Sequence, residues 1–388
     1  MACFLAFSVK APVFAESIKV GAILPLTGRL SELGGMTEFQ SFQLAADEIN
    51  SSGGIGGKKI ELIIEDTAGK RDVGISAIEK LISEDKVIVV GGGFSSTVAW
   101  AASAVAQERE VPFLINTASA DKITEEPREY IFRLNSPISE QALALESFLQ
   151  EVLSVKSAAI LYEKTHLGRF LADKFIEQCR NLGLDVVAKE SFEVGSPELE
   201  TFFQEMAAIK PDLFYMISNA GEGSILMRKA KEVGLNSKVF MGNPSGFALQ
   251  AFRKAAGDLS TYVYAPVIWS PSVPYDGAAR FSKTFVQKYE VDADYHAAQA
   301  YAAMYVISDA LKRSDSLTPK GVRDALAATD MMTVLGRVRF VSYGKMRQQN
   351  RLPTYLVQWI NSKLVTVWPT KFAERNYIYP TPIWDERF

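Results

Sequence analysis

The chain has 388 residues, of which 48% are hydrophobic and 22% are charged, and its formal net charge is −3. This length predicts two or three domains whose cores need no disulfide, and the composition excludes disordered, collagenous and coiled-coil chains. The near-neutral charge argues against a general nucleic-acid binder, and two His with two Cys leave too few ligands for a typical zinc site.

Residues 1–15 are expected to be the remnant of an export signal. An apolar stretch, Ala2–Phe7, precedes Val13-Phe14-Ala15, and small residues at the outer positions of such a triplet suit a signal-peptidase site. The usual basic start is missing, so an ordinary N-terminal extension stays the alternative. Elsewhere no apolar run approaches the ~20 residues that a membrane-spanning helix requires. Signal removal would take Cys3 and leave Cys179, whose helical setting predicts a buried, inert thiol.

From residue 18 to residue 267, short runs rich in β-branched residues alternate with helical patterns. Within residues 39–50, for example, Phe42, Ala45 and Ile49 share one helix face. Near-continuous apolar strands joined by helices are typical of a parallel sheet that is covered on both faces. The predicted strands are Ile18–Leu24, Lys59–Glu65, Val87–Gly91, Val111–Ile115, Tyr130–Leu134, Ala158–Tyr162, Asp185–Glu190, Leu213–Ile217, Lys238–Met241 and Tyr262–Val267.

These elements form two blocks, about residues 16–134 and 138–262, which predict two similar Rossmann-like α/β lobes. The pattern changes after residue 265. The tail, residues 371–388, contains Pro380 and Pro382, so we expect an extended segment that is held to the surface by its aromatic residues. Before the tail, the sequence predicts helices at Tyr275–Tyr289 and Tyr295–Arg313 and strands at Val338–Val341, Thr354–Ile360 and Leu364–Trp368.

Enzyme signatures are weak, so we expect neither catalysis nor a cofactor. The run Gly91-Gly92-Gly93-Phe94-Ser95-Ser96 lacks the third glycine of a dinucleotide fingerprint and falls in the third strand–helix unit. No phosphate-binding G-x-x-x-x-G-K-[ST] and no G-x-S-x-G occurs in the sequence. His166 and His296 lie far apart without a neighbouring Cys or paired acid, so we predict structural roles for both and no metal site, although His166 could line a cleft.

Two loops carry hydroxyl groups where predicted strands give way to helices. Ser95, Ser96 and Thr97 are expected to open one helix, and Thr117, Ala118 and Ser119 a short second one. Free N–H groups and the dipole make a helix N-terminus an anion site, and ligands bind at the carboxyl ends of strands in open α/β sheets. Ser and Thr are also common helix caps. Capping is the simpler explanation of one such loop, whereas two in adjacent units make a carboxylate or phosphate site a comparable alternative.

Several motifs together resemble the type I periplasmic binding proteins of ABC transporters, in the leucine/isoleucine/valine-binding branch. The resemblance covers residues 16–370, and it depends on the order and spacing of the motifs. It is carried by Ile18–Gly28, Ala45–Asn50, Gly53–Lys58, Glu65-Asp66, Phe94–Ser96, Pro112–Ser119 and Phe240–Gly242.

The resemblance implies two lobes joined by a three-strand hinge that close on a ligand. Lobe I is expected to comprise residues 16–135 plus 266–343, and lobe II residues 136–265 plus 344–370. The connections would lie near Leu134–Pro137, Val263–Pro266 and Tyr343–Pro353. The family also implies export to the periplasm or the extracellular face and delivery of the ligand to an ABC permease in the membrane. We expect a monomer that binds no nucleic acid.

Matched to the family motifs, this sequence keeps the groups that would hold a ligand carboxylate but changes others. Positions that would contact the carboxylate are Ser95, Ser96, Thr117, Ala118 and Ser119, and positions facing the rest of the ligand are Leu33, Tyr162, Leu167, Asn219 and Ser245. The cysteine pair of some members is replaced by Ala68 and Phe94, which fits an oxidising periplasm, where a single cysteine would be a liability.

The acidic residue that pairs with a ligand ammonium in leucine-type members falls near Ser245. An unpaired, desolvated ammonium costs several kcal/mol. Either Asp121, Glu163 or Glu222 replaces that residue, or the ligand has no α-amino group. The expected ligand is therefore a branched-chain or other hydrophobic amino acid, or an aromatic or aliphatic acid. A ligand-sensing receptor or regulator of the same fold is the first alternative function, and an α/β enzyme is the second.

Overall fold

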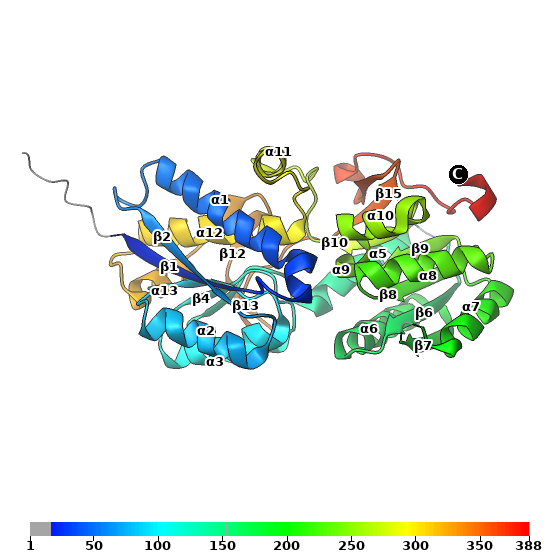
Figure 1. Cartoon of the computed structure of the whole chain (residues 1–388), viewed down its shortest axis with the longest axis horizontal. Helices are drawn as coiled ribbons and strands as arrows, with labels where there is room; N and C mark the ends of the chain where they lie inside the picture. The colour runs from blue at the N-terminus through cyan, green and yellow to red at the C-terminus, as the bar shows by residue number, and fades with distance from the viewer. Residues whose placement is uncertain (1–16, 153, 194, 388) are drawn as a thin grey trace, which may run out of the picture.

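A computed structural model describes residues 17–152, 154–193 and 195–387, so the expected signal remnant and Cys3 lie outside the described residues. Two α/β lobes lie side by side along the long axis of the molecule (Figure 1). Each lobe is built on its own seven-stranded mixed sheet, and a two-stranded hairpin, β11 (Asp330–Thr333) with β12 (Gly336–Arg339), forms a third, small sheet.

Lobe I contains the sheet β2-β1-β3-β4-β5-β14-β13. Its strands are β1 (Ile18–Leu24), β2 (Ile60–Asp66), β3 (Val90–Gly92), β4 (Phe113–Ile115), β5 (Ile131–Arg133), β13 (Val341–Tyr343) and β14 (Met346–Gln349). Helices α1 (Met36–Ser51) and α12 (Tyr295–Arg313) cover one face, and α2 (Arg71–Ser83) and α3 (Ser96–Glu108) cover the other (Figure 1). The remaining elements of this lobe are a π-helical turn (Ser31–Gly35), α4 (Lys122–Glu125), α11 (Ala278–Tyr289) and α13 (Pro319–Ala327).

Lobe II contains the sheet β7-β6-β8-β9-β10-β15-β16. Its strands are β6 (Ser157–Glu163), β7 (Asp185–Phe192), β8 (Leu213–Ile217), β9 (Val239–Gly242), β10 (Tyr264–Val267), β15 (Tyr355–Ile360) and β16 (Lys363–Trp368). One face packs against α5 (Ile138–Val152) and α6 (His166–Leu182), and the other against α7 (Pro197–Ile209), α8 (Ala220–Glu232) and α10 (Gln250–Ala256). The short α9 (Pro244–Phe247) follows β9.

The two sheets share one strand order. In lobe I, β2, β1, β3, β4 and β5 run parallel, and in lobe II the corresponding parallel strands are β7, β6, β8, β9 and β10. This confirms the predicted pair of Rossmann-like lobes. The strand order reverses between β1 and β3 and between β6 and β8, and ligands of open α/β sheets bind beside such reversal points, at the carboxyl ends of the strands.

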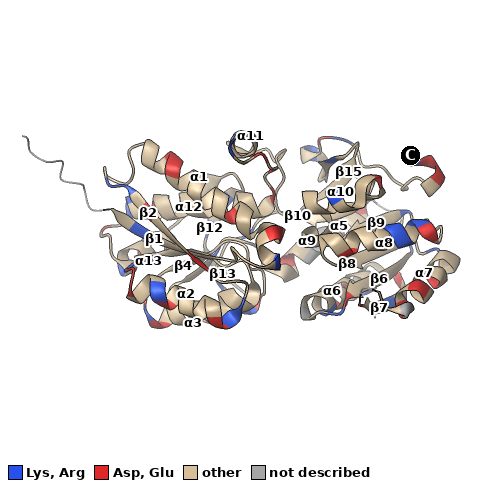
Figure 2. Ribbon diagram, in the orientation of Figure 1, with Lys and Arg blue, Asp and Glu red and all other residues tan. Residues whose placement is uncertain are grey.

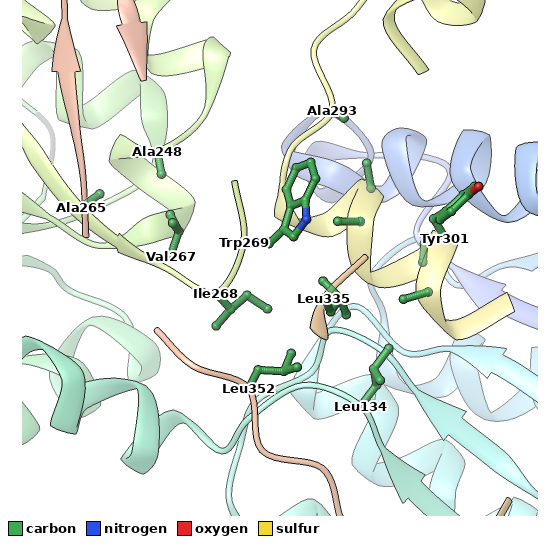
Figure 3. Close-up of a cluster of buried hydrophobic side chains, with 14 of the residues drawn as sticks. Leu134, Ala248, Ala265, Val267, Ile268, Trp269, Ala293, Tyr301, Leu335 and Leu352 are labelled. Carbon is green, nitrogen blue, oxygen red and sulfur yellow. The ribbon is translucent and has the colours of Figure 1, made fainter. Parts of the chain in front are cut away.

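Three connections join the lobes and pack around a shared apolar cluster. Leu134 follows β5, Ile268 follows β10, and Leu352 lies between β14 and β15; all three are buried in the same core. Figure 3 shows their side chains beside Leu335 and Trp269, where the ribbons of the two lobes meet. The hinge is therefore a packed apolar junction, which suits rotation of whole lobes about a fixed axis.

Two lobe boundaries differ from those expected. Strand β10 ends at Val267 in the second sheet, and β14 belongs to the first sheet, so the chain returns to lobe II after Asn350 and not at residue 344. Strand β14 is polar because one of its side chains is the hydrogen-bond partner of a buried guanidinium. The Oε1 atom of the fully buried Gln349 accepts a 2.6 Å hydrogen bond from Nε of Arg133 on β5.

The C-terminal tail follows the surface of lobe II. The Trp384 indole donates a 2.7 Å hydrogen bond to the Leu235 carbonyl, its ring lies 5.7 Å from Phe240, and the Arg387 guanidinium stacks on it at 3.7 Å. Aromatic anchors thus hold the segment, although short 3₁₀ turns at Thr370–Phe372 and Trp384–Glu386 interrupt it. Within the described ranges, none of the helices combines the length and apolar character needed to cross a membrane.

Candidate ligand-binding cleft

A cavity of about 740 Å³ lies between the two lobes, at the carboxyl ends of the strands of both sheets. Eight of the ten candidate residues line it: Leu33, Ser95, Ser96, Thr117 and Ser119 from lobe I, and Leu167, Asn219 and Ser245 from lobe II. The loops that carry them flank both strand-order reversals, so the fold brings together residues that are more than 200 positions apart in the chain.

The wall in lobe I presents the N-terminus of α3. Ser95 is the N-cap residue, and its side chain makes no capping hydrogen bond. The backbone N–H groups of the first helical turn have no intrahelical acceptor, and the positive end of the helix dipole favours an anion there. Ser95, Ser96 and Thr97 all line the cavity, so hydroxyl groups and free N–H groups face the same space.

The loop after β4 contributes to the same wall but does not open a helix, as was expected of it. Helix α4 begins only at Lys122, and Thr117–Ser119 form a loop. Ala118 does not line the cavity, because its N–H donates to the Gly93 carbonyl (2.9 Å) and its side chain packs in the core. Ser119 does line it, and its backbone carbonyl accepts a 2.8 Å hydrogen bond from the N–H of Ile138 at the start of α5.

A buried polar cluster supports this loop from behind. The Thr117 hydroxyl donates to the carboxyl group of the fully buried Glu38 on α1, and Asn116 donates to the same carboxyl oxygen at 2.9 Å. Gln299 on α12 lies 2.9 Å from the Thr117 hydroxyl. Burial raises the pKa of Glu38 to about 8, and the nearby negative charge of Asp294 adds to the shift. The Thr117 hydroxyl is therefore already engaged by the protein, and its backbone carbonyl accepts a hydrogen bond from the Asn135 side chain.

Aromatic side chains complete the lobe I wall. The Phe94 ring stacks on the His296 ring at 4.9 Å, and Tyr295 lies 4.0 Å from the same imidazole. Gly34 (φ 154°) touches this stack so closely that a Cβ atom would lie 2.6 Å from the imidazole. His296 is hydrogen-bonded within the protein, which is consistent with the structural role predicted for it: its Nδ1 atom lies 3.3 Å from an Asp294 oxygen. The sequence reasoning did not anticipate that it also lines the cavity.

The facing wall in lobe II is set by short-range hydrogen bonds. Thr165 caps α6 by accepting the N–H of Gly168 (3.0 Å), which places Leu167 in the first turn with 51% of its surface exposed. Asn243 accepts the Ser218 N–H at 2.9 Å and donates to the Ser245 hydroxyl at 2.8 Å. These contacts present one apolar and several polar groups opposite the α3 N-terminus.

Tyr162 does not line the cavity, contrary to expectation. It lies on β6, where side chains alternate between the two faces of the sheet, and it packs in the core beneath α6 together with Ile160. Cys179 is buried in the same core, and burial raises the pKa of its thiol to about 12, as predicted for an inert cysteine.

The charged groups around the cavity favour an anion. Asp121 is the one carboxylate among the described residues that line it, and its Oδ1 atom accepts the Ser139 N–H at the start of α5 (3.3 Å). Lys122 and Lys174 also line it. Glu163 and Glu222 do not line the cavity; instead they face Arg29, which pairs with Glu222 at 3.2 Å.

The structure adds cavity residues that lie along one face of α6 and were not predicted. Leu167, Phe170, Leu171, Lys174, Phe175 and Gln178 all line the cavity. These residues recur at helical periodicity and so form one stripe along α6. In a sequence, such a stripe can mark a helix face that packs in the protein core as readily as one that contacts a ligand. In the part of the chain that the structure describes, no three His, Cys, Asp or Glu side chains are grouped so that they could hold a metal ion.

The chain is similar to known binding proteins over almost its whole length. A model of the periplasmic binding protein family matches residues 17–363. The chain is 26% identical over 377 residues to Leu/Ile/Val-binding protein homolog 7 of Brucella melitensis, and the match covers 94% of each chain. Its fold is similar to that of the branched-chain amino acid transporter substrate binding protein LivJ of Streptococcus pneumoniae in complex with isoleucine (TM-score 0.80, 24% identity, 90% of this chain and 98% of that one).

A solute binding protein of an ABC transporter from R. palustris, in complex with benzoate, has the same fold (TM-score 0.77, 21% identity, 91% of this chain and 96% of that one). These findings confirm the resemblance seen in the sequence, and they place the chain among binding proteins and not among enzymes. The chain belongs to the periplasmic binding protein family, and within it the chain is similar to Leu/Ile/Val-binding protein homologues.

Proposed function

We propose that this protein binds a small monocarboxylate with an apolar body and no α-amino group, and that closure of the two lobes encloses it. The observation that carries the proposal is the uncapped N-terminus of α3 beside Ser119, which faces an otherwise largely apolar cavity. A carboxylate there would accept charge-assisted hydrogen bonds from Ser95 and from backbone N–H groups, each contributing about 1.5–3 kcal/mol.

The rest of the cavity suits an apolar body. Leu30 and Leu33 line it from the loop after β1, Phe94 from the loop after β3, and Leu167 and Pro244 from lobe II. Ligand groups that touch both lobes favour the closed arrangement, because a ligand shifts a conformational equilibrium only by binding one state better. The closed shape is what a membrane permease of an ABC transporter would recognise, in the periplasm or on the extracellular face.

Free amino acids are disfavoured as ligands because the acidic residue that would pair with their ammonium group is not present near Ser245. Ser245 occupies the region where an acidic residue was expected in leucine-type relatives, and it is hydrogen-bonded to Asn243. Asp121 caps α5, and the other two acidic candidates lie outside the cavity. An amino acid whose ammonium pairs with Asp121 is the second candidate ligand, and it is favoured by the place of that carboxylate in the cavity wall.

The experiment compares two solutes that differ only in the amino group. Isothermal titration calorimetry of the full chain with 4-methylpentanoate and with L-leucine is expected to give at least tenfold tighter binding of 4-methylpentanoate, because leucine would bury an ammonium without a dedicated partner. The variant Ser95→Ala should weaken 4-methylpentanoate binding roughly tenfold or more. The control Ser76→Ala removes an exposed hydroxyl on α2 outside the cavity and should leave the Kd unchanged.

If leucine binds more tightly than 4-methylpentanoate, the proposal that the ligand lacks an α-amino group is wrong. If Asp121→Asn then removed the preference for leucine, the second candidate would stand. An unchanged Kd for Ser95→Ala would contradict the proposed carboxylate position whichever solute binds.

A further inference from the structure

The cavity does not end at the cleft between the lobes. It continues inside lobe II, between α5 and α6, where Leu145, Phe175, Gln178 and Tyr215 line it although each is no more than 5% exposed. From Leu167 to Gln178 it follows α6 for about 16 Å at the helical rise of 1.5 Å per residue. We call the part lined by Leu145, Leu171, Phe175, Gln178 and Tyr215 the inner channel.

The whole cavity is large for a small-molecule site. Its volume of about 740 Å³ lies in the upper half of the roughly 300–1,000 Å³ range of pockets that enclose drug-sized ligands. Tyr215 lies on β8, and its ring contacts the Phe175 ring of α6 at 4.4 Å, so these two side chains form the inner end of the cavity wall. The channel walls are mainly aliphatic and aromatic, so it suits an apolar occupant.

A polar group lies within this apolar channel. Tyr215 lines the cavity and is 4% exposed, so its phenol brings a hydroxyl group into these apolar walls. Burial raises the pKa of this phenol, so the group stays protonated and offers both a donor and an acceptor. A hydroxyl group in an otherwise apolar wall favours an occupant that carries a hydrogen-bonding atom at this depth. The Gln178 amide lines the same channel.

Tyr215 lies on β8 two residues before the strand ends, whereas Asn219, which lines the cleft, is the N-cap residue of the following helix α8. We propose that the inner channel is a second subsite, which holds the far end of an elongated carboxylate whose apolar body enters between α5 and α6 and whose terminal hydroxyl or carbonyl reaches Tyr215. The inference rests on the proposed function, because the carboxylate end is the one held by Ser95 and Ser119. A second carboxylate at the far end would place a charge in an apolar channel and is disfavoured.

The test measures the Kd of four carboxylates of increasing length by calorimetry on the full chain. They are benzoate, 3-phenylpropionate, 5-phenylpentanoate and 5-(4-hydroxyphenyl)pentanoate. Each pair of added methylenes that enters the channel should tighten binding by roughly tenfold. The terminal hydroxyl should tighten binding a further 3- to 10-fold or so in the wild type. In Tyr215→Phe, which keeps the ring and its packing, that last gain should disappear while benzoate binding is unchanged.

A blocking variant tests the path of the ligand. Leu171→Trp fills the channel between α5 and α6, so it should remove the gain from chain length, measured as the ratio of the Kd values of benzoate and 5-phenylpentanoate. The matched control is Ile176→Trp, since Ile176 is a partly buried residue of α6 that does not line the cavity. In this control, the longer carboxylates should still bind more tightly than benzoate, as in the wild type.

The outcomes separate the two proposals. If benzoate binds but longer probes bind no more tightly, or gain equally in Leu171→Trp, the inner channel is overturned and the proposed function stands. If none of the carboxylates binds, short or long, the proposed function fails and the channel proposal fails with it.

Discussion

Glu38 shows how a single buried residue can couple the cleft to pH. Its carboxyl group is fully buried behind the cavity wall, where Thr117 and Asn116 donate to it and the Asp294–His296 pair lies nearby on α12. Burial raises its pKa from 4.5 to about 8. The folded protein therefore holds a proton on this group at neutral pH, whereas the unfolded chain does not.

Linkage gives the sign of the effect on stability. Because the folded state binds more protons than the unfolded state between pH 4.5 and pH 8, the free energy of unfolding falls as pH rises through this window. The loss at pH 7 is on the order of 3 kcal/mol. We predict that Glu38→Gln flattens this slope, as measured by urea unfolding at pH 5, 6, 7 and 8. The exposed Glu84→Gln is the control, and a slope in Glu38→Gln equal to that of the wild type would contradict the assignment.

Helix α6 carries much of the lobe II wall, and its start is held by one cap. The Thr165 side chain accepts the Gly168 N–H, and a Cβ atom on Gly168 would lie 2.2 Å from the Glu163 carbonyl. The first turn then presents Leu167 and Phe170 to the cavity. The position of these two side chains thus depends on backbone geometry at the carboxyl end of β6.

We predict that Thr165→Ala costs about 1 kcal/mol of stability and also weakens 4-methylpentanoate binding, because the first turn of α6 loses its fixed position. The matched control is Thr318→Ala, since Thr318 caps α13 by accepting the Gly321 N–H at 3.2 Å and lies outside the cavity. Urea unfolding should show a similar loss in both variants, and calorimetry should show weaker binding only in Thr165→Ala. Equal effects of both variants on the Kd would contradict this role for α6.

Elements with a strong local pattern were predictable from the sequence. Strands β1 and β8 and helix α12 have the expected bounds, because apolar runs and helical periodicity mark them directly. Strand β14 was missed, since its Met-Arg-Gln-Gln sequence pairs with a buried Arg133 from a distant part of the chain. The loops that line the cavity were found through their hydroxyl groups. The ligand-facing stripe of α6 was not, because a stripe of apolar residues does not reveal whether protein or a cavity covers it.

At the scale of the whole molecule, the two lobes meet at the apolar hinge and also across the cleft. Arg29 of lobe I pairs with Glu222 of lobe II at 3.2 Å and lies 4.0 Å from Glu163. The pair is partly exposed to solvent, so it adds little to the stability of this arrangement of the lobes. In Figure 2, Lys and Arg residues are interspersed with Asp and Glu residues on the visible helices of both lobes. Because neither lobe presents a surface of one charge sign here, the preference for one solute over another should come from contacts with the enclosed ligand.

The account depends on one geometric claim, that a ligand carboxylate sits between the lobes at the N-terminus of α3. The most direct measurement is a crystal structure of the full chain with 4-methylpentanoate. We predict carboxylate oxygens within hydrogen-bond distance of the Ser95 hydroxyl and of N–H groups in the first turn of α3, with the aliphatic body against Leu167. A carboxylate bound elsewhere while the α3 N-terminus faces only solvent would contradict the claim.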